Sequence, residues 1–384
     1  MKLLYISTPS FADCDFPLIR EYQRKKIDVT YLILLPPFSL KSTLLDIRKQ
    51  IPKTGIFLAT EYSEFKKYES YMDMNKVYVA NRTGRNSLSI SYWKHKLDLY
   101  LFIKRGGFDI IHCDYMLGHG MSFLFKLTKK WIQTIHDPFP HSGEISSRKT
   151  KIYNNTISNS DYFVLLNERQ KKEFCTYYGV NEERVFINRL GIYDNIKAFV
   201  KPEHKVKSNN ILFFGRISPY KGIEYLCEAI IKVREVVPDV TLTIAGGGKM
   251  YFDIDPYKQL GYTDIRNHYV GMGELAELLS ECELSVCPYT DATQRGVIMT
   301  SYALGKPVIA TDVGGLPEMI EQDRTGIIIP PRDSSALAIA IIKILKDKNK
   351  LQEMSAYINN EYGNGEKSWN SIAKKYIQIY NSIL

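Results

Sequence analysis

Short apolar runs alternate with amphipathic segments along the whole chain. In the first half, apolar runs of strand length occupy 2–7, 28–35, 109–113, 131–135, 161–166 and 184–188. Patterns of helical period separate them, at 18–26, 92–105, 118–129, 146–159 and 168–178. This alternation predicts parallel strands covered by helices. We expect a loop over 8–17, and loops with short helices over the Lys-, Tyr- and Ser-rich segment 36–78.

The second half repeats the pattern after a polar stretch at 201–210, which predicts a linker. Strands are expected at 211–214, 240–245, 268–270, 284–287 and 308–310, and helices at 223–237, 273–281 and 333–345. Segment 367–384 is amphipathic and predicts a helix that crosses back to the first domain. We therefore expect an α/β protein of two Rossmann-like doubly wound domains facing across a cleft. The expected domains are 1–200 plus 366–384, and 201–365.

The stretch 291–318 has the clearest local pattern. A loop ends at Gly296 and opens a short helix, which Gly305 and Pro307 stop. An apolar run follows, and it leads into a second turn and another helix start. Because helix N-termini present unpaired N–H groups and partial positive charge, this arrangement is suited to binding phosphate.

Composition places the chain among ordinary globular proteins, with 384 residues, 45% hydrophobic and 24% charged. The net charge of +9 lies wholly in the first half, where residues 1–200 hold 30 Lys and Arg against 20 Asp and Glu. Three interpretations of this excess stay open: a solvated basic surface, contact with anionic lipid or a lipid-phosphate-linked substrate, and nucleic acid. No nucleic-acid recognition motif accompanies the charge, so we expect no nucleic-acid partner.

The cellular location of the protein is inferred from its apolar segments and from its cysteines. No apolar run reaches 18 residues, and the start MKLLYISTPS is too short and too soon polar for a signal peptide. The six cysteines are scattered without a metal-ligand spacing, which indicates reduced, mostly buried thiols. We expect a cytoplasmic protein, with a peripheral position at the inner face of a membrane as an open possibility.

The loop GRISPYKG places Arg216 and Lys221 after the strand 211–214. Ligands of α/β proteins bind at the carboxyl ends of parallel strands, and two cations there suit a diphosphate. Glycine-containing turns at 246–248, 271–273 and 314–315 are also expected at strand ends. No GxGxxG follows the first strand, which argues against a dinucleotide oxidoreductase.

Longer stretches then resemble one known family. The chain contains, in this order, FFGRISPYKGIEYLCEAI, TIAGGG, YVGMG, ELAELLSECELSVCPY and GVIMTSYALGKPVIATDVGGLPEMI. These resemble the donor-binding domain of GT-B glycosyltransferases of family four, which are retaining enzymes that use nucleotide sugars. In the first half, TIHDP and SDYFVLLNERQ followed by RVFINRLGI resemble the acceptor domain of the same family.

The resemblance implies roles for individual residues. Gly215, Arg216 and Lys221 would bind the donor diphosphate, with the main chain of Gly296 and Val297 holding its distal phosphate. A second set would contact the rest of the donor: Gly271, Met272 and Thr300 at the nucleobase and ribose, and His136 as the catalytic residue facing the transferred sugar. The alternative for His136 is a histidine that is only hydrogen-bonded at a strand end.

Two parts of the family pattern are missing. The family's glutamate pair falls at Ala292 and Thr300, so neither carboxylate is present. The donor sugar would instead meet Asp291, Gln294 and Arg295. The glycine pair of the first loop is also absent, and the acceptor loop would use Asp13, Asp15 and Phe16.

We expect a metal-independent, retaining glycosyltransferase. It would move a sugar from a nucleotide-diphosphate sugar to a glycan or lipid-linked acceptor, in bacterial surface polysaccharide synthesis. No cofactor is expected, since the nucleotide sugar is a co-substrate and no DxD motif stands near the proposed phosphates. Two alternatives stay open: a catalytically silent relative that binds a nucleotide sugar, and a GT-B-like epimerase or phosphorylase.

Overall fold

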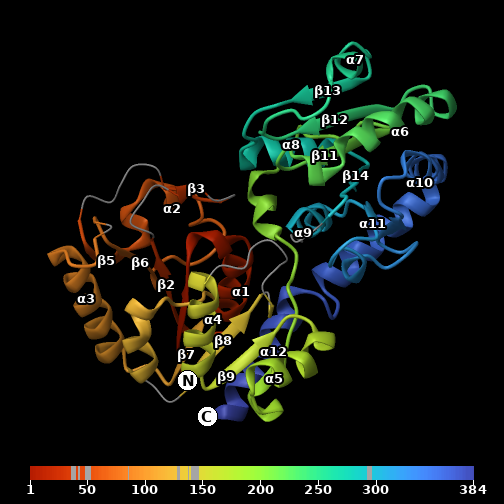
Figure 1. Ribbon diagram of the computed structural model, residues 1–384. Coiled ribbons are helices and arrows are strands. Elements are labelled where there is room, and N and C mark those ends of the chain that lie inside the picture. Colours follow the sequence, from red (N-terminus) through yellow and green to blue (C-terminus); the bar gives the residue numbers. More distant parts are fainter. Residues whose placement is uncertain are drawn as a thin grey trace. The chain divides into compact units, whose positions relative to one another are not determined.

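Two sheets, each built mainly of parallel strands and one in each of two units, organise the chain (Figure 1). The computed structural model describes residues 1–35, 40–41, 44–47, 53–84, 86–127, 130–136, 138–139, 147–291 and 296–384. The first unit comprises Met1–Gly191 and Trp369–Leu384, and the second comprises Ile192–Ser368. The expected α/β class is therefore confirmed, with a doubly wound sheet in each unit.

The first unit contains an eight-stranded sheet. Its strands, in spatial order, are β10 (Val185–Ile187), β9 (Tyr162–Leu165), β8 (Trp131–Ile135), β7 (Ile110–Cys113), β1 (Lys2–Ser7), β2 (Asp28–Leu34), β6 (Val77–Asn81) and β5 (Gly55–Leu58). All neighbouring pairs are parallel except the antiparallel pair of β5 and β6. The strand order reverses between β1 and β7, which makes this the switch point where doubly wound sheets bind ligands.

Helices of the first unit connect these strands. The α-helices are α1 (Ala12–Arg24), α2 (Ser63–Lys66), α3 (Ile90–Gly106), α4 (Ser147–Asn159), α5 (Lys171–Tyr178) and α12 (Trp369–Ile383). Short 3₁₀ segments are η1 (Pro9–Phe11), η2 (Ala59–Glu61), η3 (His119–Leu127), η4 (Glu168–Gln170) and η5 (Glu182–Arg184). A separate two-stranded ribbon joins β3 (Leu40–Lys41) to β4 (Asp46–Ile47).

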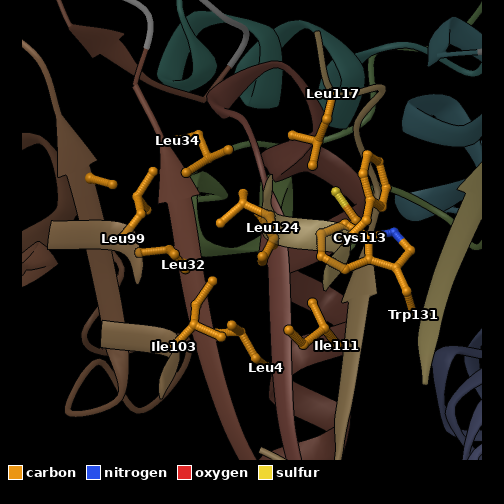
Figure 2. Packing of buried hydrophobic residues seen from close by; sticks show 13 residues of the cluster. Leu4, Leu32, Leu34, Leu99, Ile103, Ile111, Cys113, Leu117, Leu124 and Trp131 are labelled. Atoms are coloured by element: carbon orange, nitrogen blue, oxygen red, sulfur yellow. The ribbon is translucent and has the colours of Figure 1, made fainter. Parts of the chain in front are cut away.

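One face of the first sheet packs its apolar side chains against α3 and η3. Leu4 and Leu32 from the strands lie beside Ile103 and Leu99 of α3, and Ile111 of β7 lies on the other side of Leu4 in the same cluster (Figure 2). Strand side chains alternate between the two faces, and buried parallel strands present branched aliphatic residues on both. This core fixes the strand ends from which the candidate site is built.

The last helix completes the first unit, as the sequence predicts. Trp369, Ile372, Tyr376 and Ile379 of α12 are buried, and the helix packs against α1. The hydroxyl of Tyr380 lies 2.5 Å from Nδ1 of His112 and 2.8 Å from the hydroxyl of Tyr22. The C-terminal segment is therefore part of the first core.

The second unit contains a six-stranded parallel sheet. Its strands, in spatial order, are β13 (Thr263–Arg266), β12 (Thr241–Ala245), β11 (Asn210–Phe214), β14 (Leu284–Cys287), β15 (Val308–Thr311) and β16 (Gly326–Ile329). Its α-helices are α6 (Ile223–Val236), α7 (Asp255–Lys258), α8 (Met272–Glu281), α9 (Gly296–Ala303), α10 (Ser334–Lys346) and α11 (Lys348–Gly363), with 3₁₀ segments η6 (Asp194–Phe199), η7 (Pro219–Lys221) and η8 (Pro317–Met319). The strand order reverses between β11 and β14, so this is the second switch point.

Several expected boundaries are wrong. The polar stretch 201–210 does not separate the units, because η6 already packs on α8 and α9 of the second unit. The amide of Tyr193 donates to the carbonyl of Met299, at 3.3 Å. The strand expected at 268–270 is instead β13, a half-exposed edge strand whose residues are mostly polar. Polar composition marks exposed chain, but it does not show where tertiary contacts change.

The expected loop 8–17 is also wrong. It forms η1 and the first half of α1, which starts at Ala12 and contains Pro17. Asp13 and Asp15 lie in the first helical turn, where carboxylates offset the helix dipole.

Two further observations concern the chain as a whole. All six cysteines are free and buried, as the sequence predicts. In the part of the chain that the structure describes, no helix combines the length and apolar character that crossing a membrane requires.

Candidate functional site

The second unit gathers the expected diphosphate residues at its switch point. Gly215 follows β11, and a Cβ built on it would lie 4.0 Å from Cγ2 of Val297 in the first turn of α9. The loop after β11 and the start of α9 therefore meet. The first N–H groups of α9 have no partner within the helix, which makes this end a site for negative charge.

Close backbone contact fixes this arrangement. Gly246 follows β12 with a φ of +153°, and a Cβ there would lie 1.8 Å from the carbonyl oxygen of Gly215. Gly222 has a φ of +61°, and its Cβ would lie 2.0 Å from the carbonyl oxygen of Pro288. Only glycine fits these two positions, so the loops after β11, β12 and β14 are held against one another.

The two expected cations lie in different environments. Arg216 is exposed, whereas Lys221 is only 4% exposed. The ammonium of Lys221 lies 3.6 Å from the ring centre of Tyr289 and 4.9 Å from that of Tyr220. Burial, together with the charge of Arg216, lowers the pKa of Lys221 to about 8. The sequence does not predict this partly desolvated lysine, and Tyr289 is a neighbour that sequence reasoning missed.

The remaining donor residues occupy several places in this unit. Gly271 is the N-cap of α8, with open space where a Cβ would be, and Met272 is buried in the first turn. Thr300 is buried, and its hydroxyl donates to the carbonyl of Gly296 at 2.7 Å. The Thr300 hydroxyl proton is therefore used within α9. Asp291 is exposed, whereas Gln294 and Arg295 lie outside the described residues.

The first unit gathers a second set of residues, at the switch point between β1 and β7. Asp114 directly follows β7, and His136 directly follows the neighbouring strand β8. Nε2 of His136 lies 3.0 Å from Oδ1 of Asp114. The imidazole also stacks on Phe11, with ring centres 4.4 Å apart. His136 keeps a side chain that is 21% exposed, so its ring remains accessible from one side.

Asp15 contributes a second carboxyl group to this cluster. It is 1% exposed and accepts hydrogen bonds from the hydroxyls of Tyr5, at 3.2 Å, and Tyr31, at 2.9 Å. Burial and the nearby charge of Asp114 raise the pKa of Asp15 well above its usual value. Burial also opposes ionisation of Asp114, but the contact with His136 outweighs it and holds the pKa of Asp114 below its usual value. The two carboxyl pKa values are therefore shifted in opposite directions, and Asp15 is the one that holds a proton more tightly.

The three residues expected in the acceptor loop lie instead in helix α1, and whether they contact an acceptor stays a prediction. Asp13 is half-buried in the first turn of α1, and Asp15 faces the buried cluster. Phe16 is fully buried and packs edge-to-face against Tyr31 and Tyr68. Phe16 is thus a core residue, because α1 begins earlier than expected and turns this side chain inward.

A pocket in the first unit opens onto this cluster. Its lining includes Asp15, Asp114, His136, Arg189, Trp369 and Tyr376. Arg189 is exposed and adds a positive charge that sequence reasoning missed. Asp114 and Asp15 follow adjacent parallel strands, so strand order could have indicated their proximity.

The cluster also contains ligand atoms of a kind that metals bind. Those of Cys14, Asp15 and Asp114 lie within 4.8 Å of one another. Metal ligands must be deprotonated, however, and burial raises the pKa of both Cys14 and Asp15 well above their usual values. The thiol of Cys14 also donates to the carbonyl of Phe11 at 3.1 Å. The raised proton affinity of Cys14 and Asp15 and the hydrogen bonds that they already make oppose binding of a metal ion.

Comparison with known proteins shows which family this architecture represents. The family model described as glycosyl transferases group 1 matches residues 208–347, and the model described as glycosyltransferase family 4 matches residues 55–194. An uncharacterized glycosyltransferase of Methanocaldococcus jannaschii is 27% identical, over 71% of this chain and 75% of its own length. An MMP alpha-(1->4)-mannosyltransferase of Mycolicibacterium hassiacum is 23% identical, over 73% of this chain and 72% of its own length.

Solved structures agree on the fold. A glycosyltransferase from Rickettsia africae covers 100% of this chain and 98% of its own, with a TM-score of 0.69 and 18% identity. Anabaena HepE, solved in complex with UDP, covers 100% of this chain and 99% of its own, with a TM-score of 0.65 and 16% identity. With both halves matched by the family's models and the whole fold by its structures, the chain belongs to the family 4 glycosyltransferases of GT-B fold.

Proposed function

We propose that this glycosyltransferase is a retaining enzyme that uses a nucleotide-diphosphate sugar. It transfers the sugar to a glycan or lipid-linked acceptor in the synthesis of a surface polysaccharide. The observation that carries the proposal is the partly desolvated Lys221, held beside exposed Arg216 and the N-terminus of α9 at the switch point of the second unit. Relatives named as a mannosyltransferase and a glycogen synthase, and a neighbour solved with UDP, support this choice of donor.

Charge development on the leaving group explains the use of these residues. As the bond from the anomeric carbon to the diphosphate breaks, negative charge grows on the diphosphate oxygens. Arg216, Lys221 and the first amides of α9 are positioned in advance, and they stabilise that charge more in the transition state than in the ground state. These three groups can offset the diphosphate charge themselves, so we propose that transfer is metal-independent.

His136 would act on the transferred sugar. The Asp114 carboxylate fixes the orientation of the imidazole, and the stacked ring of Phe11 limits its rotation. The acceptor hydroxyl attacks the sugar from the face that the diphosphate leaves, and its proton passes to a departing phosphate oxygen. No side-chain nucleophile is needed in this scheme.

The basic first unit supports a lipid-linked acceptor. Residues 1–200 carry the entire positive excess of the chain, which favours contact with an anionic membrane surface where such acceptors are found. We propose a cytoplasmic protein that meets the inner face of the membrane peripherally.

A thermal-shift screen against nucleotide sugars tests the proposal, because a ligand that binds only the folded state raises its stability. We expect one nucleotide sugar and its nucleoside diphosphate to raise the melting temperature. Changing Arg216→Ala together with Lys221→Ala should lower nucleoside-diphosphate affinity by about a hundredfold or more, since charge-assisted hydrogen bonds contribute about 1.5–3 kcal/mol each.

Lys346→Ala is the matched control, because Lys346 is an exposed cation at the end of α10 in the same unit. It should bind like the wild type. Undiminished affinity in the double variant would exclude this site. Hydrolysis of the nucleotide sugar without acceptor would count against a catalytically silent relative, and interconversion of two nucleotide sugars would favour an epimerase.

A further inference from the structure

Helix α3 exposes an apolar stripe to solvent. Its side chains, with their exposed fractions, are Ile90 (88%), Trp93 (58%), Leu97 (55%) and Tyr100 (39%), and Leu88 (82%) lies just before the helix. From Ile90 onward these positions are three or four residues apart, so they share one face of the helix. The opposite face packs on the core of the first unit through Leu99 and Ile103. A surface helix normally presents polar residues outward, whereas α3 has apolar residues on its solvent face as well as on its core face.

Cations lie on both sides of the stripe. The ammonium of Lys96 lies 4.9 Å from the ring centre of Trp93 and 5.0 Å from that of Phe123. Lys94 occupies the other side, and exposed Lys104 and Arg105 follow in the last turn. Asp98 is the acid of this helix, and Lys94 pairs with it at 2.6 Å. Aromatic and aliphatic side chains with lysines beside them are typical of helices that lie in a membrane interface.

A groove next to the stripe is also basic. It runs between α3 and the edge strand β5, which lie side by side in the first unit (Figure 1), and has a volume of about 740 Å³. Its lining includes three cations, one carboxylate that pairs with Lys94, and apolar side chains: Lys53, Lys94, Arg105, Asp98, Phe57, Leu101 and Phe102. This is room for a lipid head group rather than for a single ion, and the charges suit its phosphate.

We propose that this surface, the α3 stripe with the α3–β5 groove, binds an anionic lipid bilayer. Ile90, Trp93 and Leu97 enter the boundary between head groups and acyl chains, while the flanking cations contact lipid phosphates. The proposal refines the membrane contact proposed above by assigning it to one surface. Lipid binding and sugar transfer are measured separately, so that either can fail alone.

Charge argues against a second copy of this chain as the occupant. In a two-fold contact the same patch meets itself, so the cations around both stripes would face one another. The single carboxylate of the helix already pairs with Lys94. An anionic bilayer neutralises these charges, whereas a second copy would repel them.

Tryptophan fluorescence gives a direct test on the wild-type protein. The chain has three tryptophans, and Trp131 and Trp369 are 0% and 5% exposed, so Trp93 is the exposed one. We expect vesicles that contain phosphatidylglycerol to shift the emission to shorter wavelength, and brominated acyl chains to quench it. Salt should weaken this binding because it screens the charges. Vesicles of phosphatidylcholine alone should bind at least tenfold more weakly.

Variants locate the surface. Ile90→Ser with Leu97→Ser should lower vesicle affinity more than tenfold, because two aliphatic side chains that enter the bilayer are lost. Lys104→Gln with Arg105→Gln should lower it about fivefold for each charge removed. The control removes an adjacent pair of lysines elsewhere in the same unit, with Lys171→Gln and Lys172→Gln on α5, and should keep most of the affinity. Trp93→Phe should still sediment with vesicles but lose the fluorescence shift.

Three results would overturn the proposal. One is no fluorescence shift and no sedimentation with phosphatidylglycerol vesicles at low salt. A second is unchanged affinity in the two α3 variants, with their folding verified by thermal unfolding. The third is concentration-dependent self-association that buries Trp93 without lipid, which would assign the stripe to a second copy.

Discussion

Nε2 of His136 lies 3.0 Å from Oδ1 of Asp114, and these two side chains follow neighbouring parallel strands. The Asp114 carboxyl faces the imidazole on one side and the Asp15 carboxyl on the other. The pKa of Asp114 is lowered and the pKa of Asp15 is raised at the same switch point, because the imidazole interacts with Asp114 whereas burial dominates at Asp15.

The first prediction concerns Asp114. We expect Asp114→Asn to lower turnover by about tenfold to a hundredfold, because the amide fills the same space but no longer stabilises a charged imidazole. Donor affinity should stay close to that of the wild type, since the proposed diphosphate residues lie in the second unit. Steady-state kinetics give both values.

His136→Ala provides the test of coupling. It should also lower turnover more than donor affinity, and the double variant with Asp114→Asn should be no slower than His136→Ala alone. Independent, multiplicative losses would show that Asp114 does not act through His136. Wild-type turnover in His136→Ala would remove this residue from the mechanism.

The second prediction concerns Asp15. Its folded-state pKa is raised, so between the unfolded and folded pKa values the folded protein binds a proton that the unfolded chain releases. The stability contributed by this proton is fully present below the unfolded pKa and is lost as the pH rises. Asp15→Asn should remove that dependence, so the variant should gain free energy of unfolding relative to wild type as the pH is raised from about pH 5 to about pH 8.

Asp15→Ala separates charge from hydrogen bonding. It leaves the hydroxyls of Tyr5 and Tyr31 without this acceptor, and we expect a loss of about 2–4 kcal/mol at about pH 5. Chemical denaturation at about pH 5 and about pH 8 measures the free energy of unfolding of both variants. A parallel pH dependence of wild type and Asp15→Asn would mean that Asp15 is ionised in the fold.

The third prediction concerns Lys221. Since burial lowers its pKa to about 8, donor affinity of the wild type should fall as the pH rises through about 8 and the lysine loses its charge. Lys221→Met keeps the shape without the charge. It should stabilise the free protein by about 1–2 kcal/mol, while donor affinity falls more than tenfold and loses this pH dependence.

Calorimetric titration and thermal unfolding of the same preparation distinguish the two possible roles of Lys221. A destabilised Lys221→Met with normal donor affinity would instead make the ammonium a structural partner of the Tyr289 ring.

The fourth prediction concerns Gly271. Its backbone is extended, with φ −80° and ψ 167°, and a Cβ there would meet open space. Asparagine is a preferred N-cap, so Gly271→Asn should leave the melting temperature unchanged or raise it. If the nucleobase lies against this backbone, the new side chain should lower nucleotide affinity about tenfold or more.

Gly261→Asn is the control, because this glycine also has open space around its Cβ position but lies before β13. Equal nucleotide affinity in Gly271→Asn and wild type would place the nucleobase elsewhere.

Periodicity predicted the elements in which buried positions recur regularly or without interruption. Helix α6 buries Ile223, Leu226, Ile230 and Val233 on one face, and the strands β8 and β15 are buried along their whole length. The edge pair β5–β6 was missed because β5 is only partly buried and its pattern is weak. The start of α1 was predicted too late because Pro17 lies inside the helix, and a proline usually marks a helix boundary.

The candidate site was predictable only where the sequence immediately around each residue marks it. Arg216, Lys221 and Gly296 follow strands in recognisable glycine-rich stretches. Asp114 and Tyr289 were missed because their role depends on neighbours from other elements, His136 and Lys221. Burial decides the charge states of Asp15 and Lys221, and sequence alone does not give burial at a strand end.

Helix α12 affects the order in which the two units can be completed during translation. Tyr380 reaches His112 and Tyr22 from a helix that follows the second unit in sequence, so strand β7 and helix α1 lack these partners until the second unit has been translated. On the ribosome, the unit that emerges first is therefore completed only after the second unit has been translated. All strands of the first sheet precede the second unit, but the contacts of α12 with α1 and β7 form only after that time.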